Sequence, residues 1–259
     1  MYDLLHALLS DKTAGDNFEV FGFWHFFYIV LTFAGVVAVL LLLREKTRRV
    51  KAKTAQIFLN AAVCLYAADF FLMPLAYGEI SIEKLPFHVC TAMCVMCFLS
   101  CHVHFLRKFR LSFVLLGLLG NAVYLFFPAG VMWYEIHPFS YRVIQTMLFH
   151  SVMCIYGFAT LAMEYKSFDI KKCHLDLAVV AGMVLWALLG NYAYSADLEG
   201  YSYSFNWFFV VRDPFNWFPE SISPVVMPFL VLVLFSAAEL LIHWILWCLQ
   251  KRSAKAAKD

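Results

Sequence analysis

The sequence predicts an all-α membrane protein, a bundle of seven transmembrane helices, and two observations lead to this fold class. The chain has 259 residues, of which 63% are hydrophobic and 15% are charged. Soluble domains have about 45–50% apolar and about 25% charged residues. The apolar residues are also gathered in stretches of about 20, the length at which a helix crosses a bilayer. We therefore expect one polytopic membrane domain over residues 1–259.

Seven stretches are long and apolar enough to be predicted as spans. They cover residues 21–43, 54–77, 85–105, 111–128, 143–163, 175–195 and 224–250. The fourth is short and is interrupted by Gly117 and Gly120, so a bundle of six spans is the alternative. The longest connection, 196–223, is dense in Tyr, Trp and Phe. Because these residues favour the headgroup layer, we expect it to form an aromatic cap at the outer interface.

Basic residues indicate how the bundle is oriented. Four polar segments hold 16 of the 20 lysines and arginines, namely 44–53, 107–110, 164–174 and 251–259. The positive-inside rule then places the N-terminus outside and the C-terminus in the cytoplasm of a multi-pass protein of the cell membrane. Topology accounts for these charges, alone or together with contacts to anionic lipids. We expect membrane lipids as partners and no nucleic acid, and the sequence leaves the oligomeric state open.

Polar residues from six of the predicted spans fall in the outer half of the bilayer. They are His25, Asp69, His88, Cys90, Asn121, Gln145, His150 and Asn191. Thr146 shares a helix face with His150, and Asn206 and Arg212 belong to the cap above. Buried polar groups in lipid need partners. Either these residues line one shared polar cavity that opens outward, or they form a structural hydrogen-bond network that holds the helices together.

Four cysteines lie in the third predicted span, where ionisable residues mark a functional candidate. Cys90, Cys94, Cys97 and Cys101 form one stripe along a helix face. The first and the last would be about 16 Å apart along the axis, too far to bind one zinc ion together. We therefore predict no metal site and no cofactor, and we expect most of these cysteines to be packing residues.

Cys90 and His150 suggest a different chemistry. A cysteine attacks as its thiolate and needs a neighbouring base, and His150 lies at a similar predicted depth in another span. Asp69 could orient the imidazole, as the third member of a catalytic triad does, and His88 is a second candidate for support. The alternative is that Cys90 packs in the core and His150 is a hydrogen-bonded core histidine.

Glu239 and His243 stand four residues apart in the last span. This spacing allows them to pair on one helix face, which would make a buried carboxylate tolerable. The pair is interpreted as structural, with a proton path or a second site as the alternative.

Several short motifs, in order, resemble a known membrane family. They are Leu85-Pro86-Phe87-His88-Val89-Cys90, Gly117 to Asn121 running to Pro128, Pro138-Phe139 leading to His150, Asn206-Trp207 leading to Arg212-Asp213-Pro214, and Ala238 to Leu241. Residues 85–250 are similar to the YwaF-type integral membrane family, whose eukaryotic branch is transmembrane protein 164. That branch resembles a cysteine acyltransferase that moves fatty acyl chains onto lysophospholipids.

The resemblance implies an acyl-transfer site that contains His150, with one departure. In the eukaryotic branch the nucleophilic cysteine directly precedes the histidine of the first motif, and here that position is Phe87. Cys90 lies three residues later, one turn deeper on the same helix face. The hypothesis is an acyltransferase or acyl hydrolase that acts on membrane lipids, with an acyl-chain donor as a further partner. The alternative is a non-enzymatic protein that binds or carries a lipid or small polar solute in the same cavity.

Overall fold

The computed structural model describes residues 17–78, 82–132, 135–164, 168–198, 201–203 and 205–256. In these ranges the chain is almost entirely helical, and its contacts group it into two compact units. The first unit combines Met1–Lys84 with Gly117–Met163, and the second combines Leu85–Leu116 with Glu164–Asp259. Each unit is therefore built from two separate stretches of sequence.

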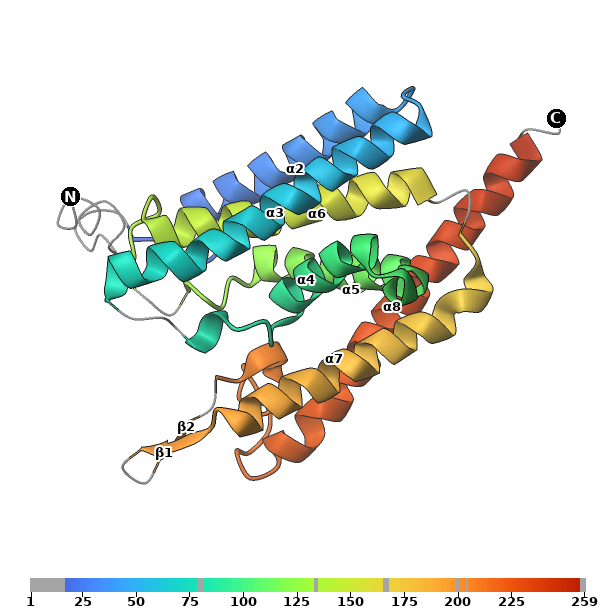
Figure 1. Ribbon diagram of the computed structural model, residues 1–259. Coiled ribbons are helices and arrows are strands. Elements are labelled where there is room, and N and C mark those ends of the chain that lie inside the picture. The colour runs from blue at the N-terminus through green and yellow to red at the C-terminus, as the bar shows by residue number, and fades with distance from the viewer. Residues whose placement is uncertain are drawn as a thin grey trace. The chain divides into compact units, whose positions relative to one another are not determined.

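The first unit contains α2 (Phe23–Leu43), α3 (Arg48–Tyr77), η1 (Ile82–Lys84), most of α6 (Tyr141–Glu164) and the second part of α5 (Arg110–Phe126). Figure 1 shows α2, α3 and α6 running along one another, and side-chain hydrogen bonds join α6 to both of the others. Leu118, Leu125 and Met147 belong to its buried core.

Helix ends in the first unit follow local sequence signals. Thr47 caps α3, because its hydroxyl accepts a hydrogen bond from the backbone N–H of Val50. The same helix stops at Gly78, whose φ of 80° is the left-handed conformation that glycine adopts at low cost. Gly157 lets α6 approach α5 closely, because an added Cβ would come within 3.0 Å of Leu118.

The second unit contains α4 (Val89–His102), η2 (His104–Phe109), the first part of α5, η4 (Ile170–Lys172), α7 (Cys173–Ala193), η5 (Trp207–Phe209) and α8 (Ser223–Ala256). Helices α7 and α8 pack along each other. Beyond α7, β1 (Ala196–Leu198) pairs antiparallel with β2 (Tyr201–Tyr203) in a short hairpin. The predicted cap 196–223 comprises this hairpin, η5 and the following loop, and its residues 199–200 and 204 lie outside the described ranges.

Six helices in the described ranges are long and apolar enough to cross a membrane, so the prediction of a multi-pass helical membrane protein is confirmed. They are Phe23–Leu43, Arg48–Leu75, His104–Phe126, Tyr141–Glu164, Ile170–Ala193 and Ser223–Arg252. Each corresponds to one of the predicted spans. The fourth, which the sequence marked as weak, is continuous through Gly117 and Gly120, because η2 leads directly into α5.

The third predicted span, 85–105, contains a helix that is too short to cross the hydrocarbon layer. Helix α4 has 14 residues, or about 21 Å, against about 30 Å of hydrocarbon. It starts late because Pro86 is followed by a turn and by His88 in an extended conformation. It ends early because Val103 is also extended (φ −96°, ψ 114°). The sequence prediction treated 85–105 as one continuous helix, since backbone breaks inside an apolar run leave no periodic signal.

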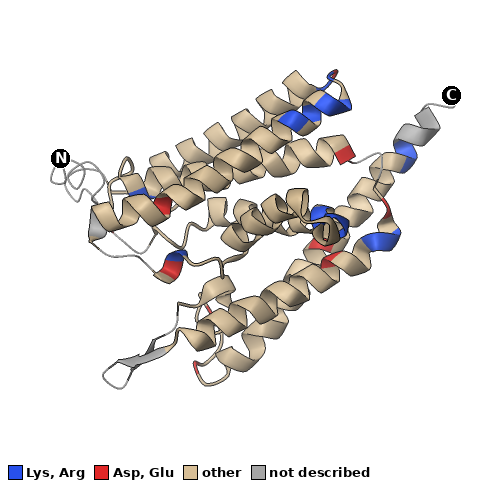
Figure 2. Cartoon of the chain, viewed as in Figure 1, with Lys and Arg blue, Asp and Glu red and all other residues tan. Residues whose placement is uncertain are grey.

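Charged residues lie at helix ends within each unit. Figure 2 shows the lysines and arginines of the first unit gathered mainly where α2 passes into α3. In the second unit they mark η2, η4 and the C-terminal end of α8. The helix bodies between these ends are almost free of charge, as a hydrocarbon environment requires.

Candidate functional site

The predicted site residues are divided between the two units. The first unit holds His25, Asp69, Asn121, Gln145, Thr146 and His150, and the second holds His88, Cys90, Asn191, Asn206 and Arg212. All of them except Asn206 and Arg212 in the cap, and His88 beside α4, lie inside helices. The geometry of each group is therefore given within its own unit.

His150 is held on α6 in one tautomer. Its Nδ1 lies 2.7 Å from the carbonyl oxygen of Thr146, and a carbonyl can only accept, so Nδ1 carries the hydrogen. In the neutral ring Nε2 is then the basic nitrogen. The ring stacks on Tyr124 of α5 at 3.7 Å between centroids and 8° between planes, and only 6% of the residue is exposed. These contacts fix both the ring plane and its basic edge.

His25, on α2 of the same unit, is arranged differently. Its Nδ1 accepts a hydrogen bond from the backbone N–H of Phe21 at 2.8 Å. Its Nε2 donates to the carbonyl of Leu125 on α5 at 2.7 Å. Both ring nitrogens of this fully buried residue are thus bonded to the backbone, and the bond to Leu125 joins α2 to α5. This pattern suits a histidine that holds two helices together.

Asp69 on α3 is bonded through both carboxylate oxygens. Tyr141 of α6 donates its hydroxyl to Oδ1 at 2.6 Å, and the Lys84 ammonium lies 3.1 Å from Oδ2. The sequence suggested Asp69 as the group that orients an imidazole. The Thr146 carbonyl, one turn back on α6, also orients the His150 ring, and the role of Asp69 stays a prediction.

Asn121 and Gln145 make backbone contacts inside the first unit. Asn121 donates to the carbonyl of Gly117 at 2.6 Å, while its buried Oδ1 has no hydrogen-bond partner in the described part of the chain. Gln145 donates to the carbonyl of Leu65 at 3.4 Å and so links α6 to α3.

Cys90 and His88 lie at the start of α4 in the second unit. His88 is the residue that precedes the helix, and its Nδ1 accepts the backbone N–H of Phe208 at 3.4 Å. Cys90 is the second helical residue and is 6% exposed. The first turn of a helix stabilises negative charge, whereas burial disfavours it, so the two effects oppose each other at this position. The next two cysteines of the stripe, Cys94 and Cys97, are fully buried packing residues.

Phe87, directly before His88, is packed against two tryptophans. Its ring lies 4.8 Å from Trp186 and 4.8 Å from Trp207, measured between centroids. Gly190 on α7 leaves the space for it, because a Cβ there would overlap the ring. Trp186 also donates its indole N–H to the carbonyl of Pro86 at 2.7 Å. Aromatic packing therefore anchors the chain just before His88.

Asn191 and Asn206 fold the cap onto the end of α7. The Asn191 side chain exchanges two hydrogen bonds with the backbone of Trp207, at 3.0 and 2.9 Å. Asn206 accepts the N–H of Arg212 at 2.8 Å and donates to its carbonyl at 2.9 Å, which closes the loop between them. Within that loop Phe208 and Phe209 have positive φ values of 58° and 54°, a costly conformation for bulky residues.

Asp213 was absent from the predicted site, although it organises the cap. Its carboxylate accepts the backbone N–H groups of Phe215 (2.8 Å), Phe218 (2.9 Å) and Trp217. Desolvation raises the pKa of Asp213, but these three N–H groups outweigh it and the pKa lies below its ordinary value. The sequence signal was an Asp followed by Pro and aromatic residues, which is typical of a turn.

Asp176 was also missed, and it changes the interpretation of the last helix. The sequence favoured a pair between Glu239 and His243. In the structure Nε2 of His243 lies 2.5 Å from Oδ2 of Asp176, on α7. All three residues are at most 3% exposed. Asp176 could not be predicted as the partner because it is 67 residues away from His243 in the chain, and only the packing of α7 on α8 brings them together.

Two further features bear on ligands. In the ranges that the structure describes, no group of three or more His, Cys, Asp or Glu side chains is arranged to hold a metal ion.

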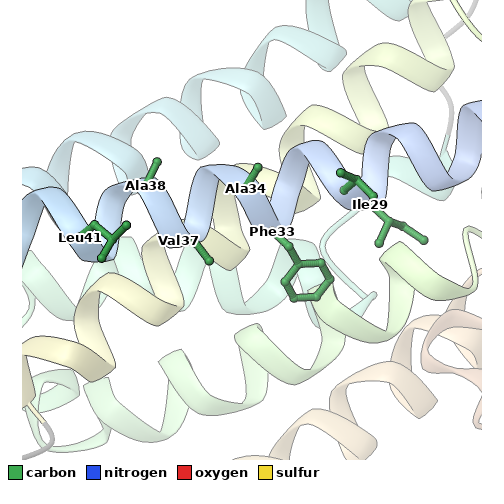
Figure 3. Close-up of a pocket in the computed structure, with 7 residues that line it drawn as sticks. Ile29, Phe33, Ala34, Val37, Ala38 and Leu41 are labelled. Carbon is green, nitrogen blue, oxygen red and sulfur yellow. The ribbon is translucent and has the colours of Figure 1, made fainter.

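A groove of about 570 Å³ runs along α2 and is lined by Ile29, Val30, Phe33, Ala34, Val37, Ala38 and Leu41. Figure 3 shows these residues along α2. The lining is entirely aliphatic and aromatic, as expected for a surface in contact with acyl chains.

Comparison with known proteins identifies one family. A model described as the TMEM164 family matches residues 20–248 of the chain. No curated protein and no solved structure matches. The match confirms the resemblance as far as this family, while the YwaF-type branch and the acyl chemistry stay predictions.

Proposed function

We propose that this chain, which belongs to the TMEM164 family, is a membrane enzyme that transfers or hydrolyses fatty acyl groups of lipids, with Cys90 as nucleophile and His150 as base. The observation that carries the proposal is the tautomer of His150. The hydrogen bond from Nδ1 to Thr146 leaves Nε2 as the basic nitrogen, and the Tyr124 ring fixes its direction. A general base needs this combination of a defined tautomer and a fixed position.

The reaction follows from these two roles. The Cys90 thiol gives its proton to Nε2 of His150, and the thiolate attacks the ester carbonyl of an acyl lipid. A thioester forms as the carbon–oxygen bond to the leaving alcohol breaks, and that alcohol takes the proton back from His150. An acceptor hydroxyl then gives its proton to Nε2 and attacks the thioester, and the Cys90 thiolate that leaves takes this proton back from His150. The acceptor is a lysophospholipid in transfer and water in hydrolysis.

The position of Cys90 in the first turn of α4 supports its role, because the helix dipole there offsets part of the cost of a buried negative charge. Asp69 and His88 are proposed as supporting residues. Gln145, Asn121 and Asn191 are proposed to border the site, together with Asn206 and Arg212 in the cap. The cap would exclude water, which favours transfer over hydrolysis.

Purified full-length protein in phospholipid vesicles tests the two roles one at a time. The substrates are a phospholipid with a fluorescent acyl chain and a lysophospholipid acceptor. Cys90→Ala and His150→Asn should each lower acyl transfer by on the order of 10²-fold or more. Asparagine is chosen because it can keep an N–H donor to Thr146 while it removes Nε2. Cys94→Ala, a buried cysteine one turn later, is the matched control and should retain activity. Undiminished transfer in both test variants would rule out the cysteine mechanism.

Lipid binding without chemistry is the second candidate, and the apolar groove along α2 favours it. In that case a lipid occupies the protein but no acyl group is transferred to it. Labelling with an acyl-directed electrophile separates the two functions. The enzyme is labelled at Cys90, and the label is lost in His150→Asn, whereas a binding protein shows no labelling that depends on His150.

The charge distribution supports an orientation with the N-terminus outside and the C-terminus in the cytoplasm. By the positive-inside rule the basic segments 44–53 and 107–110 both belong to the cytoplasmic side, which requires one crossing by α3 and a return through α4. The proposal is therefore seven crossings, with α4 and its extended flanks as the shortest.

A further inference from the structure

A cluster of three titratable side chains lies inside the second unit, away from the residues that the proposed reaction uses. Asp176 projects from α7, and Glu239 and His243 project from α8. Asp176 and His243 are in contact at 2.5 Å. The Phe168 ring packs edge-on against His243 with 4.4 Å between centroids, and Gln250 holds the Phe168 carbonyl at 3.0 Å.

Glu239 is the member of the cluster that has no partner. Its exposed fraction is 0%, and neither carboxylate oxygen has a hydrogen-bond partner among the described residues. An ionised carboxylate in a membrane interior without a donor or a counter-charge is very unfavourable. Asp176 is also near enough for its negative charge to repel a charge on Glu239. The protonated acid avoids both costs.

Asp176 differs from Glu239 in two features of its surroundings. It lies in the first turn of α7, where the helix dipole stabilises negative charge. It also contacts His243, which supplies a positive charge when it is protonated. Glu239 lies near the middle of α8, where the backbone N–H groups are used within the helix. The two carboxyl groups are thus distinguished by position, and only one needs an added proton.

Charged groups also lie on the elements packed around the cluster. Helix α8 packs against α7, η4 and η5, and α7 also packs against η2. On α7 itself His174 is exposed and Cys173 is half-buried. Lys171 and Lys172 of η4 are exposed, as are Arg107 and Lys108 of η2. The residues of η5 carry no charge. Over the described ranges, neither Asp176 nor Glu239 is paired with a lysine or an arginine.

From this arrangement we infer that Asp176, His243 and Glu239 form a proton-binding site inside the membrane domain, with the exchangeable proton on the Glu239 carboxyl at neutral pH. His243 is the group that carries this proton between Glu239 and the end of the helix pair. It stands one turn, about 6 Å, from Glu239 toward the C-terminal end of α8. That end lies beside the exposed residues of η4. With protons on both His243 and Glu239, the cluster has no net charge.

Infrared difference spectroscopy of the full chain, in a detergent without ester groups, tests the site. A protonated carboxylic acid has a carbonyl band that is separate from the bands of carboxylates and amides, and this band shifts in heavy water. The wild type should show it at neutral pH, and Glu239→Gln should lose it. Glu220→Gln removes an exposed glutamate of the cap and should keep it. A wild-type spectrum without the band, or a band that persists in Glu239→Gln, would overturn the proposal.

The role of His243 has its own test. After transfer into heavy water, the time course of the band shift reports how fast the Glu239 proton exchanges with solvent. His243→Phe replaces the imidazole by an apolar ring and should slow this exchange by on the order of 10²-fold. His174→Phe is the exposed control and should exchange at the wild-type rate. Equal rates in both variants would mean that His243 does not carry the proton. If His243→Phe fails to fold, His243→Gln replaces it, and the same comparison applies.

Discussion

Buried carboxylates in the two units have opposite surroundings. Asp69 in the first unit receives a hydroxyl and an ammonium, one on each oxygen. Glu239 in the second unit is more completely buried, yet neither of its oxygens has a partner in the described ranges. A partnered charge contributes to holding helices together, whereas an unpartnered acid has to take up a proton. The comparison shows that the environment of a buried acid, more than its burial, decides whether it is structural or titratable.

Two histidines of the first unit, His25 and His150, also differ in the partners of their ring nitrogens. His25 uses both ring nitrogens in bonds to the backbone of two elements. His150 uses Nδ1 on its own helix and keeps a defined basic nitrogen at Nε2. The first arrangement stabilises the fold, and the second is the one expected of a general base.

The largest effect on stability is expected for Asp69→Asn. The change leaves Lys84 without its carboxylate, and losing one partner of a buried pair costs about 3–5 kcal/mol. Because 23% of the Lys84 side chain is exposed, we expect a smaller loss of about 2–3 kcal/mol. Glu239→Gln should change the unfolding free energy at neutral pH by less than about 0.5 kcal/mol, since it replaces a neutral acid. Reversible unfolding in mixed micelles measures both free energies. Equal losses of unfolding free energy in Asp69→Asn and Glu239→Gln would contradict the difference inferred between the two carboxyl groups.

A pH-dependent effect is expected for the cap. The pKa of Asp213 is lowered in the folded state, so its stabilising contribution is complete above the unfolded value of about 3.9. It is lost as the pH falls through the lower folded value. Tryptophan fluorescence of the full chain should therefore show an acid transition that Asp213→Asn lacks. Asp169→Asn is the control, because Asp169 accepts one backbone N–H instead of three. A wild-type transition unchanged by Asp213→Asn would contradict this account.

The smallest effect is expected where α2 meets α6. The hydroxyl groups of Thr32 and Ser151 lie 2.6 Å apart, and each also bonds to a carbonyl on its own helix. Hydrogen bonds of this kind between membrane helices contribute about 0.6 kcal/mol on average. A double-mutant cycle with Thr32→Val and Ser151→Ala should give a coupling energy near that value. A coupling above about 2 kcal/mol would show that this contact has a larger part in the unit than we infer.

The sequence predicted much of the fold and less of the site. Six spans could be located because length and hydropathy are local properties of the chain. The short α4 could not, because the extended conformations of His88 and Val103 leave no mark in an apolar run. The polar residues could be listed, but their partners depend on contacts between distant segments. The pairing of Asp176 with His243 and the hydrogen bond from Tyr141 to Asp69 are of this kind.

One measurement tests the difference between partnered and unpartnered acids most directly. It compares the protonated-carboxyl infrared band at neutral pH in Asp69→Asn and in Glu239→Gln, each against the wild type. The band should be unchanged in Asp69→Asn and absent in Glu239→Gln, because the Asp69 carboxylate is paired with Lys84 and Tyr141 whereas Glu239 is proposed to hold a proton. Loss of the band in Asp69→Asn together with its retention in Glu239→Gln would contradict the roles assigned to the two carboxylates.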